Sequence, residues 1–172
     1  MNYGTIKKRD IANGPGVRVS LFVSGCTHHC PGCFNADTWD FDYGTPFTAA
    51  TEQELVELMA PNFICGLSLL GGEPMEPRNQ AVLLPLLRRL KQLYPQKTVW
   101  CYSGYTLEEL QGDGRAHSEH TDEMLSLIDV LVDGRFVLAK KDIRLRFRGS
   151  SNQRLIDLNK TRATGEITLW DD

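Results

Sequence analysis

Short apolar segments alternate with amphipathic stretches along most of the chain, and this alternation constrains the fold more than any other feature of the sequence. Four segments rich in aliphatic and aromatic residues are predicted strands: VRVSLFVS (17–24), FICGLSLL (63–70), KTVWCY (97–102) and DVLVD (129–133). A helical pattern stands between each of these strands and the next. Such alternation indicates an α/β fold with a mostly parallel sheet, in which ligands bind at the carboxyl ends of the strands.

The predicted helices are marked by their caps and their apolar spacing. A capping-box pattern predicts a helix that begins at Thr51 and ends before Pro61, and a second such pattern predicts a short helix from Thr106. A leucine-rich amphipathic helix is expected over about 79–94, where Pro85 should kink it or delay its start. A further helix is predicted over 121–128, after a polar surface loop at 112–120. Two candidate strands follow near the C-terminus, at 154–158 and 166–170.

The chain has 172 residues, whereas a closed eight-fold β/α barrel takes about 250. A succession of β/α units in this length therefore predicts an incomplete (partial) β/α barrel. The net charge of −3 argues against a protein that binds nucleic acid through its overall charge. Because no apolar run approaches the roughly 20 residues of a membrane span, and the amino-terminal segment lacks the apolar core of a secretion signal, a cytoplasmic protein is expected.

Three of the five cysteines fall in one short loop, CTHHCPGC, directly after the first predicted strand. Thiolate is a soft ligand that suits iron–sulfur clusters and zinc. Cys26, Cys30 and Cys33 can hold a [4Fe–4S] cluster and leave one iron open, which is the position that catalysis needs. The alternative is a zinc ion held by the three cysteines and by His28 or His29. Since no second cysteine knuckle is present, the spacing favours the iron–sulfur cluster.

The other cysteines and the two loop histidines have simpler interpretations. Cys65 and Cys101 stand in apolar segments and are expected to be buried small side chains on strands. His28 and His29 are expected to be partly solvated loop residues rather than metal ligands.

The cysteine loop after one strand, with Gly-Gly-Glu-Pro after the next, resembles the radical S-adenosylmethionine (SAM) superfamily. Five motifs in order resemble, more closely, the family of anaerobic ribonucleoside-triphosphate reductase activating proteins: NGPGVR (13–18), LFVSGCTHHCPGCFN (21–35), GGEP (71–74), VLVDGRF (130–136) and RGSSNQ (148–153). The resemblance covers about residues 2–154. It implies a single domain of radical SAM type over 1–172, with a family core at 1–154 and a C-terminal extension at 155–172.

The resemblance also implies the site residues. Cys26, Cys30 and Cys33 would hold one [4Fe–4S] cluster, and SAM would chelate the open iron through its amino and carboxylate groups. The segment Gly71, Gly72 and Glu73 matches the family's contact to the methionine amino group, which oxygen acceptors suit. Further SAM contacts are implied at Gly32, Phe34, Ser103, Asp133 and Arg135, and no catalytic side chain is implied beyond the cluster and SAM.

The activity implied by the resemblance is that of a glycyl-radical activase. Reductive cleavage of SAM would lead to hydrogen abstraction from a glycine of the anaerobic reductase. The electron would come from an external one-electron donor such as flavodoxin. No nucleic-acid or membrane partner is expected. A partial barrel leaves an open side through which a loop of a protein substrate can enter. Two alternatives remain: another short radical SAM enzyme acting on a small molecule, and a zinc-binding interaction module. A basic stretch at 135–148 suits either an acidic partner or a solvated face.

Overall fold

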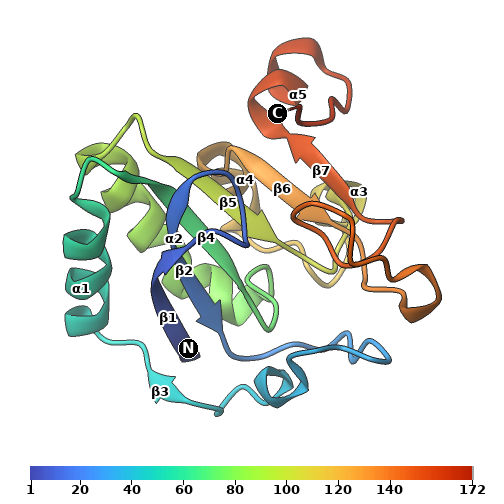
Figure 1. Ribbon diagram of the computed structural model, residues 1–172, viewed down its shortest axis with the longest axis horizontal. Helices are drawn as coiled ribbons and strands as arrows, with labels where there is room; N and C mark the ends of the chain where they lie inside the picture. The colour runs from blue at the N-terminus through green and yellow to red at the C-terminus, as the bar shows by residue number, and fades with distance from the viewer. Residues whose placement is uncertain (172) are drawn as a thin grey trace.

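A computed structural model describes residues 1–171 of the protein and contains one seven-stranded sheet, in the order β3-β1-β2-β4-β5-β6-β7 (Figure 1). The four predicted strands form its centre and run parallel to one another. They are β2 (Val17–Val23), β4 (Ile64–Gly71), β5 (Thr98–Tyr102) and β6 (Val130–Asp133). The prediction of an α/β fold with a sheet that is parallel in its middle is confirmed.

Antiparallel strands complete both edges of the sheet. On one side β1 (Asn2–Asp10) pairs with β2 and with the short β3 (Thr45–Pro46). The sequence pattern did not indicate β1, because most of its residues are polar and only half-buried or exposed. On the other side β7 (Arg154–Asp157) pairs with β6. The predicted strand at 166–170 is reduced to one bridge, between Ile156 and Leu169.

The helices follow the predicted order with different ends. Helix α1 (Ala49–Met59) begins earlier than predicted, because Thr48 is the capping residue and Thr51 is its partner in the capping box. In α3 (Leu107–Gln111), the predicted capping box between Thr106 and Glu109 is present. The remaining helices are α2 (Pro77–Leu93), which contains Pro85, α4 (Thr121–Leu127), the unexpected α5 (Leu158–Thr164), and the short 3-10 helices η1 (Ala36–Trp39) and η2 (Leu138–Lys140).

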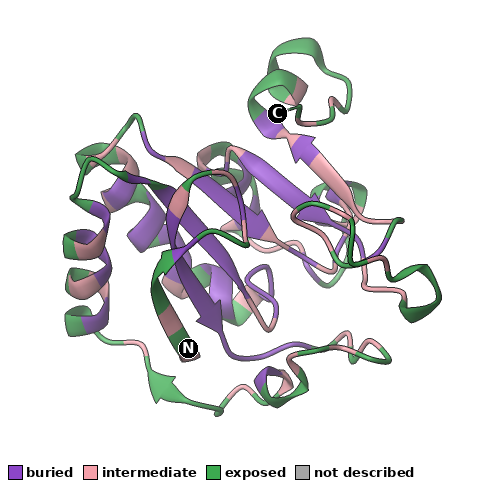
Figure 2. Ribbon diagram, in the orientation of Figure 1, coloured by how far each residue is buried: buried purple, intermediate pink, exposed green. Residues whose placement is uncertain are grey.

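The main hydrophobic core lies between the sheet and the helices. Alternate strand residues, such as Val19, Leu21 and Leu69, are fully buried and belong to one cluster with leucines of α1 and α2. The central strands are accordingly buried over nearly their whole length, whereas α5 and residues 165–171 are largely exposed (Figure 2). Among the described residues, no helix is both long and apolar enough to cross a membrane.

The opposite face of the sheet is more polar at the start of its strands. The fully buried guanidinium of Arg18 donates to the hydroxyl groups of Ser68 (2.8 Å) and Thr98 (3.0 Å), and so ties β2, β4 and β5 together. Burial lowers the pKa of Arg18 to about 10. A small apolar cluster on this face contains Trp100, with Phe147 and other half-buried side chains packed against it.

The two predicted buried cysteines differ. Cys101 is fully buried in β5, as predicted. The prediction for Cys65 is wrong, since this residue is exposed. The cause is a shift in the pairing of β2 with β4: Val17 is opposite Ile64 and Arg18 is opposite Gly66, so Cys65 is left unpaired at a bulge.

Candidate functional site

A cavity of about 490 Å³ lies where the parallel strands end. Its size is within the range of about 300–1,000 Å³ that is usual for small-ligand sites. The loop after β2, the ends of β4, β5 and β6, and the segment 141–149 contribute to its lining. All the predicted site residues line it except Asp133 and Arg135: the lining includes Cys26, Cys30, Cys33, Gly32, Phe34, Gly71, Gly72, Glu73 and Ser103.

The three loop cysteines all line this cavity, with Cys26 buried and the other two half-buried. Burial raises the pKa of Cys26 to about 12 and also raises the pKa of Cys30. The thiol form is therefore favoured until a metal compensates the thiolate charge, as in other sites where metal binding releases protons.

Within residues 1–171, no three histidine, cysteine or acidic side chains converge as ligands of one metal ion. A structural zinc site needs all four ligands at a single ion. A [4Fe–4S] cluster binds each thiolate at a different iron, so its sulfur ligands need not converge. The donor set of three thiols on one cavity wall fits such a cluster.

Glu73 connects the two motifs that surround the cavity. Its carboxylate is 1% exposed and accepts hydrogen bonds from the backbone N–H of Met75 (2.8 Å) and of Gly104 (2.6 Å). It also bonds to Nε2 of His28 at 2.8 Å. His28 comes from the cysteine loop and Gly104 from the end of β5, so one carboxylate joins three segments. These hydrogen bonds tie the Gly-Gly-Glu-Pro turn to the cysteine loop and to the end of β5.

His28 differs from the expectation for a partly solvated loop residue, because its side chain is only 2% exposed. Its ring packs edge-on against Tyr105, with the ring centroids 4.3 Å apart. Gly104 allows this contact, since a Cβ at that position would lie 2.5 Å from the imidazole ring. His29, by contrast, is exposed and stacks on Trp39.

A second acidic residue, Glu76, which no sequence motif marks, also holds the cysteine loop. Oε1 of Glu76 accepts from both the backbone N–H (2.9 Å) and the hydroxyl group (2.6 Å) of Thr27. The side-chain amide of Asn79 donates to the carbonyl oxygens of Ser24 and Glu73. The only sequence signal for these roles is position, because both residues closely follow the Gly-Gly-Glu-Pro motif.

The two glycines of that motif are required by close backbone approach. Gly71 has a φ of +111°, and a Cβ there would lie 2.5 Å from the backbone nitrogen of Val23. A Cβ on Gly72 would lie 2.7 Å from the carbonyl oxygen of Gly25, just before the first loop cysteine. Larger side chains would therefore push the motif away from the cysteine loop.

Two of the predicted SAM contacts lie outside the cavity lining. Asp133 is 1% exposed, and its carboxylate accepts from the Arg154 guanidinium and from the backbone N–H of Leu107. The guanidinium of Arg135 makes two hydrogen bonds to Glu109, at 3.0 and 3.1 Å. Both charges are therefore already paired within the protein.

The remaining predicted contacts do face the cavity. The ring of Phe34 lines it while remaining 87% exposed. Gly32, with a φ of +76°, contributes backbone next to the third cysteine. The hydroxyl group of Ser103 accepts from the backbone N–H of Tyr105 at 3.1 Å and still has its own proton to donate.

Comparisons with known proteins agree with the chemistry of this site. A family model described as a 4Fe-4S single cluster domain matches residues 12–156. A relative from Pasteurella multocida (strain Pm70) is 45% identical over 155 residues, which cover 89% of this chain and 95% of the relative. A relative from Escherichia coli (strain K12) is 44% identical, with 89% and 96% covered, and one from Enterobacteria phage T4 is 39% identical, with 90% and 93% covered. All three are named anaerobic ribonucleoside-triphosphate reductase-activating protein.

Proposed function

The chain belongs to the family of anaerobic ribonucleoside-triphosphate reductase-activating proteins, and on this premise we propose that it is an oxidoreductase that generates a glycyl radical on an anaerobic ribonucleoside-triphosphate reductase. The observation that carries the proposal is that three cysteines and the Gly-Gly-Glu part of the Gly-Gly-Glu-Pro motif line one cavity at the carboxyl ends of parallel strands. In α/β proteins this edge of the sheet is where ligands bind.

We propose that Cys26, Cys30 and Cys33 hold a [4Fe–4S] cluster with one open iron and that SAM binds beside it. Such a cluster would supply the one electron for reductive cleavage of the S–C5′ bond of SAM, which would release methionine and leave a carbon-centred radical able to abstract a hydrogen atom from a glycine Cα of the reductase. The protein supplies placement and excludes competing reactions. An external one-electron donor such as flavodoxin, and a cytoplasmic location, belong to the same proposal.

The residues in and around the cavity would have different roles in binding and positioning. The backbone at Gly32, Gly71 and Gly72, which lines the cavity together with the cysteines, would offer polar groups to a ligand, and the hydroxyl group of Ser103 would offer a donor at the end of β5. Glu73 would hold the motif and the loop at the correct separation through its bond to His28. Asp133 and Arg135 would act indirectly, through their partners Arg154 and Glu109.

The finer architecture is part of the proposal. We describe the parallel centre of the sheet as an incomplete β/α barrel of radical SAM type, with residues 1–154 as the family core and 155–172 as a C-terminal extension. An unclosed barrel leaves one side on which a loop of a protein substrate can reach the cluster.

Anaerobic reconstitution tests the proposal. The protein is loaded with iron and sulfide, reduced with dithionite and given SAM, and 5′-deoxyadenosine is measured with and without the cognate reductase. We expect SAM cleavage and, on the reductase, the doublet of a glycyl radical in electron paramagnetic resonance. Cleavage without any such doublet would favour a small-molecule substrate. Colourless protein with stoichiometric zinc and no SAM cleavage would refute the radical chemistry.

A further inference from the structure

A strongly basic segment borders the cavity and has no role in the chemistry described above. We call residues 138–149 the basic loop. Its basic residues outnumber its single acid, Asp142, in a chain whose net charge is −3: they are Lys140, Lys141, Arg144, Arg146 and Arg148. A local excess of positive charge in an acidic protein indicates a surface for an acidic partner.

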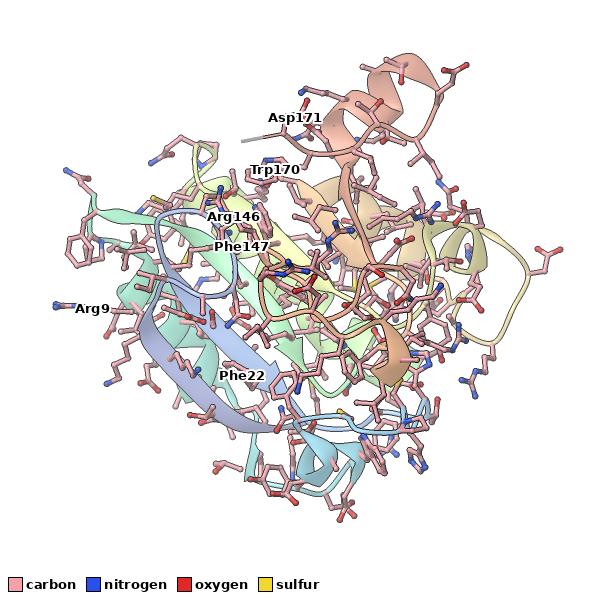
Figure 3. The ribbon with its side chains drawn as sticks, turned by 45° about the vertical axis from the view of Figure 1, so that its right-hand side comes forward. Arg9, Phe22, Arg146, Phe147, Trp170 and Asp171 are labelled. Carbon is pink, nitrogen blue, oxygen red and sulfur yellow. The ribbon has the colours of Figure 1, made fainter. Side chains whose placement is uncertain are left out.

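The basic loop has a defined shape. Its two arms are joined by a bridge between Lys141 and Ser150 and by a hydrogen bond from the N–H of Asp142 to the carbonyl of Gly149. Phe147 anchors its far arm, because the ring lies edge-on to Trp100 and Trp170 at centroid distances of 5.3 and 6.0 Å. Figure 3 shows Phe147 beside Trp170, with Arg146 next to it.

The near arm contacts the cysteine loop. The side chain of Leu138 lies against Gly32, where an added Cβ would be 2.9 Å from it. The basic loop is thus held between the proposed cluster site on one side and the C-terminal segment on the other. A partner that binds this loop would lie directly beside the cavity.

The rim of the cavity combines exposed apolar side chains with available positive charge. Phe34 is 87% exposed, Ile143 is 91% exposed and Leu138 is 54% exposed. Lys140 and Lys141 are exposed, and neither makes an ion pair within the part of the chain that the structure describes. Arg144 is paired with Asp142, two residues before it, at the surface, where such a pair contributes little and a stronger partner can replace it.

We propose that the basic loop, together with Phe34, is the docking surface for an acidic, partly apolar segment of the reductase. This inference rests on the proposed function and adds to it the surface that recognises the protein substrate. The basic side chains would steer the reductase segment by its carboxylates, and the apolar rim would be covered on docking. Docking there would bring the reductase segment to the mouth of the cavity that the three cysteines line.

A pair of charge-reversal variants tests the inference. Lys140→Glu with Arg144→Glu changes two exposed side chains that do not line the cavity. The matched control is Lys8→Glu with Lys160→Glu, which makes the same change in net charge at two exposed lysines that do not line the cavity and that, like Arg144, are in surface ion pairs. Each protein is reconstituted and assayed for SAM cleavage alone and for glycyl-radical yield over a range of reductase concentrations and salt.

The expected result is specific to the reductase. The basic-loop variant should need about tenfold more reductase for half-maximal radical yield and should lose most of the salt dependence, whereas the control should stay within about twofold of the unchanged protein. SAM cleavage without reductase should be equal in all three proteins. The neutral pair Lys140→Ala with Arg144→Ala should give an intermediate shift if charge, rather than loop folding, is responsible.

Other outcomes separate this inference from the proposed function. If the unchanged protein yields no glycyl radical on the reductase, the proposed function fails. If it does yield the radical, and both charge-reversal pairs behave alike, the docking surface is wrong. The docking surface would also be wrong if the basic-loop variant cleaved less SAM than the unchanged protein to the same extent with and without reductase. The loop would then serve the SAM site itself.

Discussion

Glu73→Gln is the substitution that most directly tests how the cavity is held together. The Glu73 carboxylate accepts from two backbone N–H groups and bonds to His28, and it is almost completely buried. A glutamine of the same shape keeps one oxygen but turns its amide N–H₂ toward at least one of these donors. Leaving a buried donor unpaired costs about 1–3 kcal/mol, and the bonds that remain lose their charge-assisted strength. We therefore expect a loss of about 2–4 kcal/mol in the free energy of unfolding.

Glu76→Gln is the matched control. Glu76 is also buried in the same turn, but a single oxygen, Oε1, accepts both hydrogen bonds from Thr27. A glutamine can keep that oxygen in place. No buried donor is then left unpaired, and what remains is the loss of the negative charge, which weakens the two Thr27 bonds and removes a favourable charge next to the start of α2 and is worth about 1 kcal/mol.

Urea unfolding of the metal-free proteins, followed by tryptophan fluorescence, measures the difference. With a urea slope of about 2 kcal/mol per M, Glu73→Gln should lower the midpoint by about 1–2 M. Iron bound after reconstitution should also fall more than in the control, because His28 no longer holds the cysteine loop in place. A midpoint for Glu73→Gln within error of that for Glu76→Gln would refute the reasoning.

Three further predictions follow from the same structure. Serine in place of any one of the three loop cysteines should abolish the brown colour and most bound iron on reconstitution, whereas Cys65→Ser, at an exposed cysteine away from the cavity, should retain both. The hydrogen bond from Arg154 lowers the pKa of Glu108 from 4.5 to about 2. The ionised Glu108 therefore stabilises the folded state fully above pH 4.5, and this contribution is lost as the pH falls toward 2. In Arg154→Met, acid unfolding curves should accordingly be less steep across that window, and an unchanged curve would contradict the assignment. Trp170→Ala should remove the support of Phe147, cost about 1–3 kcal/mol and increase trypsin cleavage in the basic loop, whereas cleavage at the original rate would show that the loop stands without it.

Much of the fold was readable from local patterns. The four central strands were predicted within two residues at each end, since continuous apolar runs reflect burial on both faces of a parallel sheet. Strand β1 was missed because it lies near a sheet edge and carries mostly polar residues. The capping residue of α1 was misplaced by three positions, because Thr48 and Thr51 are both acceptable caps and only the backbone geometry chooses between them.

The sequence alone determined which chemistry the protein carries. The spacing of three cysteines in one loop is a local property, and it limits the ligand to a thiolate-bound metal centre wherever the loop lies. The succession of strands and helices then placed this loop and the Gly-Gly-Glu-Pro turn at the same edge of a sheet, because the ends of parallel strands coincide.

Only the tertiary structure decided what each side chain does there. Glu73 and His28 are 45 residues apart, and their hydrogen bond depends on the register between β2 and β4. The same is true of Asp133, whose carboxylate is paired with Arg154 of the antiparallel edge strand and is not part of the cavity lining. Such pairings depend on how distant segments pack together in three dimensions. A local pattern of residues therefore does not predict which acidic side chain bonds to which basic one.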